Sequence, residues 1–397
     1  MKPRFAVFVR PWLGFGGADR LAIDAALALQ AAGWRVEMWV NECRDPDAIP
    51  EVANGALTVR VEKAEGRGRF SRFRLWRNLR RQRRLLRALR QSSVAPDLFV
   101  CDALVHAAAW MRRDWPDARV LAYCHYPDAL FPGQWSWPHR VYRWAAARLE
   151  ERGLAAAHRI VVNSEFTRAA VRQTFPSLRN REISVVHPGT SVVSLPPRHA
   201  QDSTVTFLAV SRFDPLKNLS LAIAAFTWLR EHTAAEEFSR CRLIIAGGYD
   251  DRRPEVVDLV TRLQAEVEGH GLRERVKLIK NPSDGALLEL WAEAFVLIHS
   301  ATEEHFGIVL IEAMMRGLPV LAVKAGGPRE IVVDGATGAL RAPTPEDFGA
   351  AMREWLRDPA RVDSMGLAAR DRARALFSAE RFAHSFVREA EQLFLTQ

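Results

Sequence analysis

Two glutamates, Glu304 and Glu312, lie eight positions apart in the stretch TEEHFGIVLIEAMMRGLP (302–319), and this spacing suits a ligand site. The apolar run predicts a helix that begins near Phe306 or Gly307. Glu304 would then lie in the preceding loop, and Glu312 less than two turns into the helix. The two carboxylates could hold opposite ends of one elongated ligand, with the unpaired helix N–H groups favouring an anion between them. A surface glutamate beside an ordinary core helix is the structural alternative.

Two cationic side chains precede this stretch. Arg212 ends a predicted strand, and Lys217 stands five residues later at the start of the next helix. Two cations there suit a diphosphate, because Arg offers a planar fork and Lys a point charge. The turn AGGP (325–328) would add free N–H groups through Gly326 and Gly327. Any surface turn can carry such residues, but together with the two glutamates they predict a site for a nucleotide sugar.

The N-terminal part of the chain carries a second group of candidates. Residues 4–10 predict a strand, and a glycine-rich turn leads from it into a helical pattern. Gly16 and Gly17 would let the backbone come close to a ligand at that helix N-terminus. Tight strand–helix turns also use glycine for purely steric reasons, so both interpretations stay open.

The motif CHYPD (124–128) follows another predicted strand, over 119–124. In open α/β sheets, ligands bind at the carboxyl edge of the strands. His125 and Asp128 are the two groups of this motif that could bind a hydroxylated acceptor or a donor sugar. A buried, hydrogen-bonded histidine is the structural alternative for His125.

Both halves of the chain alternate predicted strands and helices. This order predicts an α/β protein with two doubly wound parallel sheets and a ligand cleft between them. A connector rich in proline and serine separates the halves. We expect an N-terminal domain over 1–187, a linker over 188–203, a nucleotide-sugar-binding domain over 204–375 and a C-terminal helix over 376–397.

The composition is that of a globular protein. The 397 residues are 48% apolar and 26% charged, which leaves room for two domains with their own cores. The four cysteines are scattered without a CxxC pair, which argues against structural zinc or a disulfide framework and suggests a reducing compartment. No apolar run approaches the roughly 20 residues of a membrane span, and Phe5–Val9 is too short for a signal-peptide core.

The net charge of +9 comes from one segment. Residues 66–90 contain eleven arginines and no acid, so taking those charges from +9 leaves the rest of the chain near −2. Leucines share one predicted helical face there, with arginines on the remainder and aromatic residues at the start. This pattern is typical of a helix lying on an anionic membrane surface. Nucleic-acid binding, or a solvated helix packed on its own domain, are the alternatives; the membrane-surface candidates are Phe73, Trp76, Arg80 and Arg84.

The chain resembles the retaining glycosyltransferases of family 4, which have two facing Rossmann-like domains (the GT-B fold). The resemblance covers nearly the whole chain and is carried by SRFDPLKN, the Glu304–Glu312 pair and AGGPREIV. Within the family it is similar to the dolichol-linked α-1,3/1,6-mannosyltransferases of N-glycan assembly, through LGFGGADRLAIDAALALQAAG, YCHYPD, AGGYDDR and EEHFGIVLIEAMMRGLPVLAVKAGGP. It departs from the family pattern at Asp19, where glutamate is usual, and at 10–12, where His-Pro-Asp is usual.

The resemblance implies a hexosyltransferase with GDP-mannose as donor and retention of the anomeric configuration. Arg212 and Lys217 would neutralise the leaving diphosphate. Glu312 would hold the ribose, Glu304 would contact the mannose hydroxyls, and His125 would lie beside the transferred sugar. The implied catalytic residues are Glu304, His125, Arg212 and Lys217; the implied donor-binding residues are Gly16, Gly17, Arg212, Lys217, Glu304, His305, Phe306, Gly307, Glu312, Gly326 and Gly327.

The implied acceptor is a polyprenyl- or dolichyl-diphosphate-linked oligosaccharide bound by His125 and Asp128, with α-1,3 and α-1,6 linkages both open. The last helix would pack back on the N-terminal domain. No Asp-x-Asp-like cluster is evident near the donor residues, so we expect no essential metal ion and no cofactor. The resemblance also implies a peripheral protein on the cytosolic face of a membrane, the endoplasmic reticulum in a eukaryote or the plasma membrane in a prokaryote.

Two other functions remain open. A family 4 transferase that uses another nucleotide sugar and another glycolipid acceptor would carry the same motifs. A nucleic-acid-binding protein would use the arginines of 66–90. We expect no nucleic-acid partner, because the basic charge is confined to that segment.

Overall fold

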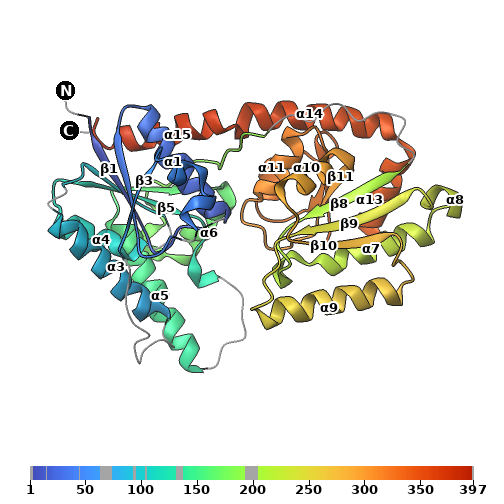
Figure 1. The fold of residues 1–397 in the computed structure, drawn as a ribbon, viewed down its shortest axis with the longest axis horizontal. Coiled ribbons are helices and arrows are strands. Elements are labelled where there is room, and N and C mark those ends of the chain that lie inside the picture. Colours follow the sequence, from blue (N-terminus) through green and yellow to red (C-terminus); the bar gives the residue numbers. More distant parts are fainter. Residues whose placement is uncertain are drawn as a thin grey trace. The chain divides into compact units, whose positions relative to one another are not determined.

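The computed structural model describes residues 3–14, 16–43, 45–62, 74–92, 95–102, 105–130, 137–192 and 204–395. The chain divides into two compact units (Figure 1). Unit 1 comprises Met1–Gly189 together with Ala379–Gln397, and unit 2 comprises Thr190–Ser378. Phe73 and most of the 188–203 linker lie outside the described residues.

Unit 1 contains a seven-stranded parallel sheet in the order β3-β2-β1-β4-β5-β6-β7. A parallel sheet is covered on both faces, so its strands read as almost continuous apolar runs. In β1 all six residues are buried, including the terminal Arg10. The strands are β1 Phe5–Arg10, β2 Arg35–Val40, β3 Thr58–Val61, β4 Leu98–Cys101, β5 Arg119–Cys124, β6 Arg159–Val162 and β7 Ser184–Val185.

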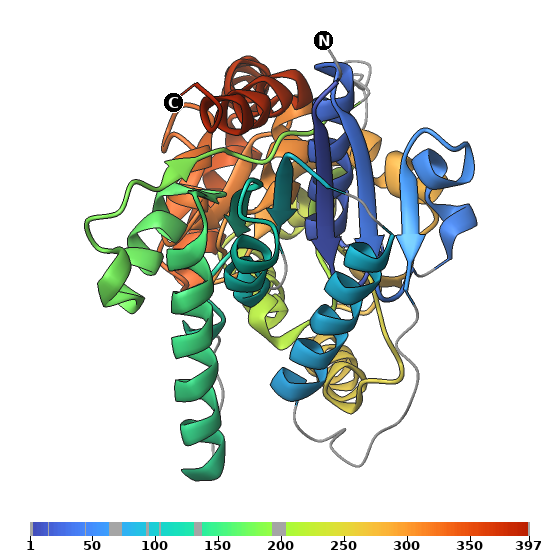
Figure 2. The same cartoon turned by 90° about the vertical axis from the view of Figure 1, so that its left-hand side faces the viewer.

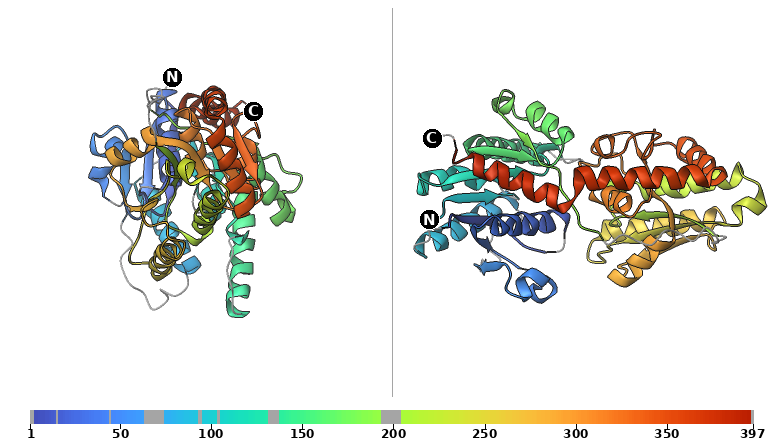
Figure 3. Two further views of the ribbon diagram at one scale, coloured as in Figure 1. Left: turned by 90° about the vertical axis from the view of Figure 1, so that its right-hand side faces the viewer. Right: turned by 90° about the horizontal axis from the view of Figure 1, so that it is seen from above.

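Helices cover both faces of this sheet. On one face α1 and α15 pack together, with Phe8 of the sheet against Phe386 (Figure 3). On the other face, residues of α3, α4, α5 and α6 share a second core with the strands. The helices are α1 Gly17–Ala31, α2 Pro50–Ala53, α3 Arg74–Gln91, α4 Ala108–Asp114, α5 Trp137–Ala156, α6 Glu165–Thr174 and α15 Ala379–Gln392, with short 3₁₀ turns η1 Pro46–Ala48, η2 Val105–Ala107, η3 Asp128–Leu130 and η4 Pro176–Leu178.

Unit 2 contains a six-stranded parallel sheet in the order β10-β9-β8-β11-β12-β13. Two apolar cores fill the spaces between this sheet and its helices. The strands are β8 Val205–Val210, β9 Cys241–Gly247, β10 Val276–Lys280, β11 Ala294–His299, β12 Val320–Val323 and β13 Gly338–Arg341. The helices are η5 Pro215–Lys217, α7 Leu219–Glu231, α8 Ala235–Phe238, α9 Pro254–Gly269, α10 Asp284–Glu293, α11 Ile308–Met315, α12 Pro328–Ile331, α13 Pro345–Arg357 and α14 Pro359–Phe377.

The predicted fold class, two doubly wound parallel sheets, is confirmed. The sequence did not predict two strands, β3 and β13, which lie at the edges of their sheets. Both are only four residues long and end in or carry arginine, so neither shows the apolar run that marks a central strand.

The arginine-rich helix α3 packs its leucines against unit 1. Leu79, Leu85, Leu86 and Leu89 are buried, and three of them belong to the core shared with α4 and α5. Gln82, which interrupts the predicted face, is buried too. The leucine face is therefore covered by protein, as in the alternative of a helix packed on its own domain. Of the membrane-surface candidates, Arg80 and Arg84 are exposed, and Trp76 lies in the first described turn.

Candidate active site

Lys217 and Glu304 meet at the carboxyl edge of the unit 2 sheet. Asp214 begins η5 by accepting a hydrogen bond from the Leu216 N–H (3.1 Å), which places Lys217 just beyond β8. The Ser300 hydroxyl, just beyond β11, donates to the Lys217 carbonyl at 2.8 Å. The Lys217 ammonium then lies 2.6 Å from Glu304 Oε2. Two neighbouring strands thus bring together groups 87 residues apart in the chain.

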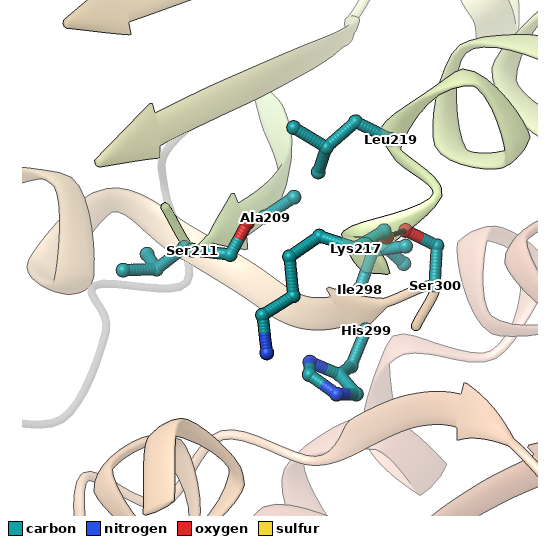
Figure 4. A pocket seen from close by; sticks show the side chains of 8 residues that line it. Ala209, Ser211, Lys217, Leu219, Ile298, His299 and Ser300 are labelled. Carbon is teal, nitrogen blue, oxygen red and sulfur yellow. Dashed lines mark hydrogen bonds between the residues drawn. The ribbon is translucent and has the colours of Figure 1, made fainter. Parts of the chain in front are cut away.

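His299, the last residue of β11, completes this cluster. Its Nε2 lies 3.2 Å from the same Glu304 Oε2. Figure 4 shows the His299 ring and the Lys217 ammonium pointing toward one space, beside the small pocket lined by the ends of β8 and β11. Burial acts to raise the pKa of Glu304, but His299 and Lys217 hold that pKa well below its ordinary value. Glu304 is therefore a carboxylate across the ordinary pH range.

His299 is a site residue that sequence reasoning missed. The available signal was its position at the end of the strand FVLIHS, immediately before the Glu304 stretch. That is the same kind of position that singled out His125. The side chain is buried (3% exposed), and its Nε2 is directed at Glu304.

The glycine turn at 325–328 packs directly against the Glu304 loop. The Gly327 N–H donates to the Glu304 carbonyl at 2.8 Å, so the expectation that this N–H is free for a ligand is wrong. Gly326 has φ +59, and a Cβ there would lie 2.2 Å from the Glu304 carbonyl oxygen. A Cβ on Gly327 would lie 2.4 Å from the Phe306 Cα. Both glycines are required by this close approach, and they fix the backbone that carries Glu304.

The residues after Glu304 have separate environments. Burial, with help from Lys217, lowers the pKa of His305 to about 4, so its ring is neutral. Phe306 is buried in the core against Phe377, which leaves only its backbone for a donor contact. Gly307 has φ +98 and caps α11, so the predicted start of the helix is confirmed.

Glu312 lies in α11 and is half-buried. Burial raises the pKa of its carboxyl, and Arg316 opposes that rise. Arg316 does not pair with the carboxylate: it donates to the Glu312 carbonyl (2.8 Å), and its guanidinium lies 4.9 Å from the Trp291 ring centre. Among the described residues the Glu312 carboxylate has no hydrogen-bond partner. The exposed Arg212 lies two residues beyond β8, and within the described chain it forms no hydrogen bond or ion pair with Lys217 or Glu304.

Unit 1 contains a different charged cluster at the end of β1. The Arg10 guanidinium is 1% exposed and lies 2.7 Å from Asp19 Oδ1 and 3.0 Å from Asp102 Oδ2. The other oxygen of Asp19 accepts the Gly16 N–H at 2.9 Å, so one carboxylate links Arg10 to the glycine-rich turn. Burial acts to raise the pKa of Asp102, but Arg10 and His125 lower it. Sequence reasoning noted Arg10 and Asp19 only as departures from the family pattern.

The candidate acceptor residues lie near this cluster. His125 is 28% exposed, with Nε2 3.6 Å from Asp102 Oδ2. Asp128 begins η3, and its N–H donates to the buried Glu150 of α5 at 3.2 Å. Burial, with the nearby charge of Asp128, raises the pKa of Glu150 to about 8.

The glycines of the first turn differ from each other. The Gly16 N–H is used by Asp19, as part of the cap of α1. A Cβ on Gly17 would meet nothing within 4 Å, so no neighbouring protein atom requires a glycine there. Gly17 therefore leaves open space at the N-terminus of a fifteen-residue helix.

Within the described ranges, no group of three or more His, Cys, Asp and Glu side chains could hold a metal ion. In the same residues, no helix is both long and apolar enough to span a bilayer.

Two protein-family models match the chain, and known proteins resemble it along most of its length. A family model described as Glycosyltransferase Family 4 matches residues 15–193, and one described as Glycosyl transferases group 1 matches residues 196–372. The chain is 33% identical over 403 residues to the α-1,3/1,6-mannosyltransferase ALG2 of Homo sapiens, covering 98% of this chain and 96% of that protein. It is 33% identical over 394 residues to the α-1,3/1,6-mannosyltransferase of Neurospora crassa, covering 88% and 80%.

Solved structures share the fold. Sucrose-phosphate synthase from Thermosynechococcus elongatus aligns with a TM-score of 0.79 at 22% identity, covering 99% of this chain and 100% of that one. Anabaena HepE, in complex with UDP and glucose, aligns with a TM-score of 0.75 at 20% identity, covering 98% and 100%.

Proposed function

This chain belongs to the family 4 glycosyltransferases, and on that premise we propose that it transfers mannose from GDP-mannose to a lipid-linked oligosaccharide. Its relatives from Homo sapiens and Neurospora crassa are α-1,3/1,6-mannosyltransferases. The observation that carries the proposal is the Lys217–Glu304–His299 cluster, in which a lysine, a carboxylate and a histidine meet at one sheet edge.

The reaction breaks the bond between the anomeric carbon of mannose and the β-phosphate oxygen of GDP. It forms a bond from that carbon to an acceptor hydroxyl oxygen, with retained configuration. Negative charge builds on the leaving diphosphate, so cations placed there stabilise the transition state more than the ground state. Lys217 has this role, with Arg212 as the second cation, and the acceptor proton passes to the leaving phosphate oxygen.

Glu304 and Glu312 hold different parts of the donor. A carboxylate accepts hydrogen bonds strongly from hydroxyl groups. Glu304 is ionised and held in place by Lys217 and His299, so it binds and orients the mannose hydroxyls. Glu312 has a carboxylate without a hydrogen-bond partner among the described residues and binds the ribose hydroxyls.

The first unit binds the acceptor. His125 and Asp128 follow β5 at the carboxyl edge of its sheet, where open α/β sheets bind ligands. Gly17 leaves room for phosphate or sugar to approach the α1 backbone. The acceptor is an oligosaccharide on a polyprenyl diphosphate, so the protein works at a membrane surface, and the face proposed is the cytosolic one.

The decisive experiment incubates purified protein with GDP-mannose and a short lipid-linked chitobiose–mannose acceptor, followed by linkage analysis of the product. We expect one or more α-linked mannoses. Transfer from UDP-sugars alone would contradict the donor. Full activity in a chelator is expected as well, because no essential metal ion is proposed; activity lost in chelator and restored by magnesium would contradict that part.

A further inference from the structure

The N-terminal half of α5 presents large apolar side chains at the surface of unit 1. Trp137, Val141 and Trp144 are 76%, 51% and 64% exposed. They stand four and three positions apart, so they lie on one face of the helix. Contiguous apolar residues that remain exposed in a folded protein indicate an interaction surface.

The charged side chains along this part of α5 are arginines, and one of them, Arg148, also forms an ion pair (3.3 Å) with Glu151, which lies farther along the helix. Between Trp137 and Leu149 the helix has no acidic residue, and Arg140 and Arg148 are exposed. The Arg148 guanidinium lies 5.6 Å from the Trp144 ring centre. Tryptophan with arginine is the combination that suits a bilayer interface, because the ring lies among the headgroups while the guanidinium binds lipid phosphate.

The arginines of α3 add positive charge on the same side of unit 1. Both α3 and α5 pack on η2, and Figure 2 shows the N-terminal ends of both helices projecting past the sheet in one direction. Arg80, Arg83 and Arg84 of α3 are exposed there, while its leucines are buried. The chain segment η3, with the acceptor candidate Asp128, precedes α5 at this edge.

We propose that the face formed by Trp137, Val141 and Trp144 binds this protein to an anionic lipid bilayer. The arginines of α5 and α3 supply the attraction to acidic headgroups, and the α5 side chains enter the interface. This moves the apolar contact from the leucines of α3, which are covered, to the aromatic face of α5. The proposal rests on the proposed function only in that a lipid-linked acceptor requires the enzyme to work at a bilayer.

The test measures flotation of the whole chain with phosphatidylcholine vesicles, with and without phosphatidylglycerol. Wild-type protein should float with the anionic vesicles, and less so as salt is raised. The double variant W137S/W144S should lose on the order of tenfold in vesicle partitioning, because two interfacial side chains are removed. Arg140→Glu should weaken the preference for anionic lipid.

A matched control is Leu367→Ser, which removes an apolar side chain that is 54% exposed on α14 of unit 2. It should float as the wild type does. GDP-mannose binding and the thermal unfolding midpoint show whether the W137S/W144S protein is folded. Transfer of mannose to a short-chain, water-soluble acceptor should be the same in W137S/W144S as in wild type. If the wild-type protein transfers no mannose to that acceptor, the proposed function is contradicted, but the flotation result still stands.

Three results would overturn the proposal. One is equal flotation of W137S/W144S and wild type. A second is a wild-type dimer in solution that the same substitutions dissociate, since this would make the face an interface between two copies. A third is displacement of the protein from anionic vesicles by RNA that binds more tightly to wild type than to W137S/W144S.

Discussion

Both units place charged groups at the carboxyl edge of a parallel sheet, but the two groups differ in their exposure to solvent. In unit 1 the Arg10 guanidinium is buried and forms ion pairs with both Asp19 and Asp102. In unit 2 the side chains of Lys217 and Glu304 are 21% and 14% exposed.

This difference in exposure separates two uses of charge. A sealed ion pair cannot exchange its partner for a ligand, so its effect is to fix the surrounding backbone. Arg10 thereby holds the glycine-rich turn through Asp19 and His125 through Asp102. An accessible pair such as Lys217 and Glu304 can open to receive a diphosphate and a sugar. The first cluster should therefore matter for stability and the second for turnover.

The largest effect is expected from Arg10→Ala. It leaves two buried aspartates without their cation, which should lower the free energy of unfolding of unit 1 by about 3–5 kcal/mol. Urea denaturation followed by tryptophan fluorescence measures this. Arg20→Ala is the control, because Arg20 pairs with Asp24 and Glu51 at the surface and should cost under about 1 kcal/mol. If both variants lose the same free energy of unfolding, buried and exposed ion pairs do not differ in the way described.

Lys217→Ala tests the accessible cluster. Loss of the cation at the leaving diphosphate should lower kcat on the order of 10²-fold. The unfolding midpoint should fall less than in Arg10→Ala, since the Lys217 side chain is partly exposed and His299 still faces Glu304. Lys277→Ala, at an exposed position of β10, is the control and should keep wild-type kcat. A Lys217→Ala protein that is unstable but catalytically normal would reverse the assignment of the two clusters.

A comparison of Glu304→Ala with Glu312→Ala separates turnover from nucleotide binding within unit 2. Glu304 contacts both cationic partners, so its loss should mainly lower turnover. Glu312 has no such partners, so its loss should mainly weaken GDP binding, by about tenfold for one charge-assisted hydrogen bond. Steady-state kinetics and calorimetric titration with GDP measure the two effects. Small and equal effects in both variants would return the glutamates to purely structural roles.

The smallest effect concerns pH, and it contrasts the partly exposed carboxyl of Glu304 with the buried carboxyl of Glu150. Glu304 faces cations and its pKa is lowered, whereas burial beside Asp128 raises the pKa of Glu150 to about 8. The stability contribution of Glu150 is full below its ordinary pKa of 4.5 and is lost as pH rises through about 8. That of Glu304 is present above 4.5 and is lost as pH falls through its lowered pKa.

Urea denaturation at a series of pH values tests this contrast. In wild type, ionisation of Glu150 should lower the free energy of unfolding by at most about 1.4 kcal/mol per pH unit between pH 4.5 and about 8. Glu150→Gln should abolish this decline. Glu304→Gln should instead remove a loss of stability on the acid side. If both variants keep the wild-type pH profile, neither carboxyl is coupled to folding in this way.

Local patterns in the sequence were sufficient for the fold class and for one part of the site. The alternation of apolar runs with helical periods predicted two parallel sheets, because a strand buried on both faces must be almost wholly apolar. The glycine before IVLIEAMM predicted where α11 begins, and with it the loop position of Glu304 and the helical position of Glu312. The fold class and the start of α11 could both be predicted because they depend on residues that are close together in the sequence.

Only the tertiary structure decided which distant groups meet. His299 joins Glu304, and Lys217 reaches it across 87 positions, because two adjacent strands end side by side. An arginine at a strand end would ordinarily be exposed, and only packing shows Arg10 sealed between two aspartates. The leucines of α3 could have faced lipid or protein, and burial in unit 1 decided for protein. Sequence determined the local elements, since their periods depend on near neighbours; partners and exposure depend on what the fold places around each side chain.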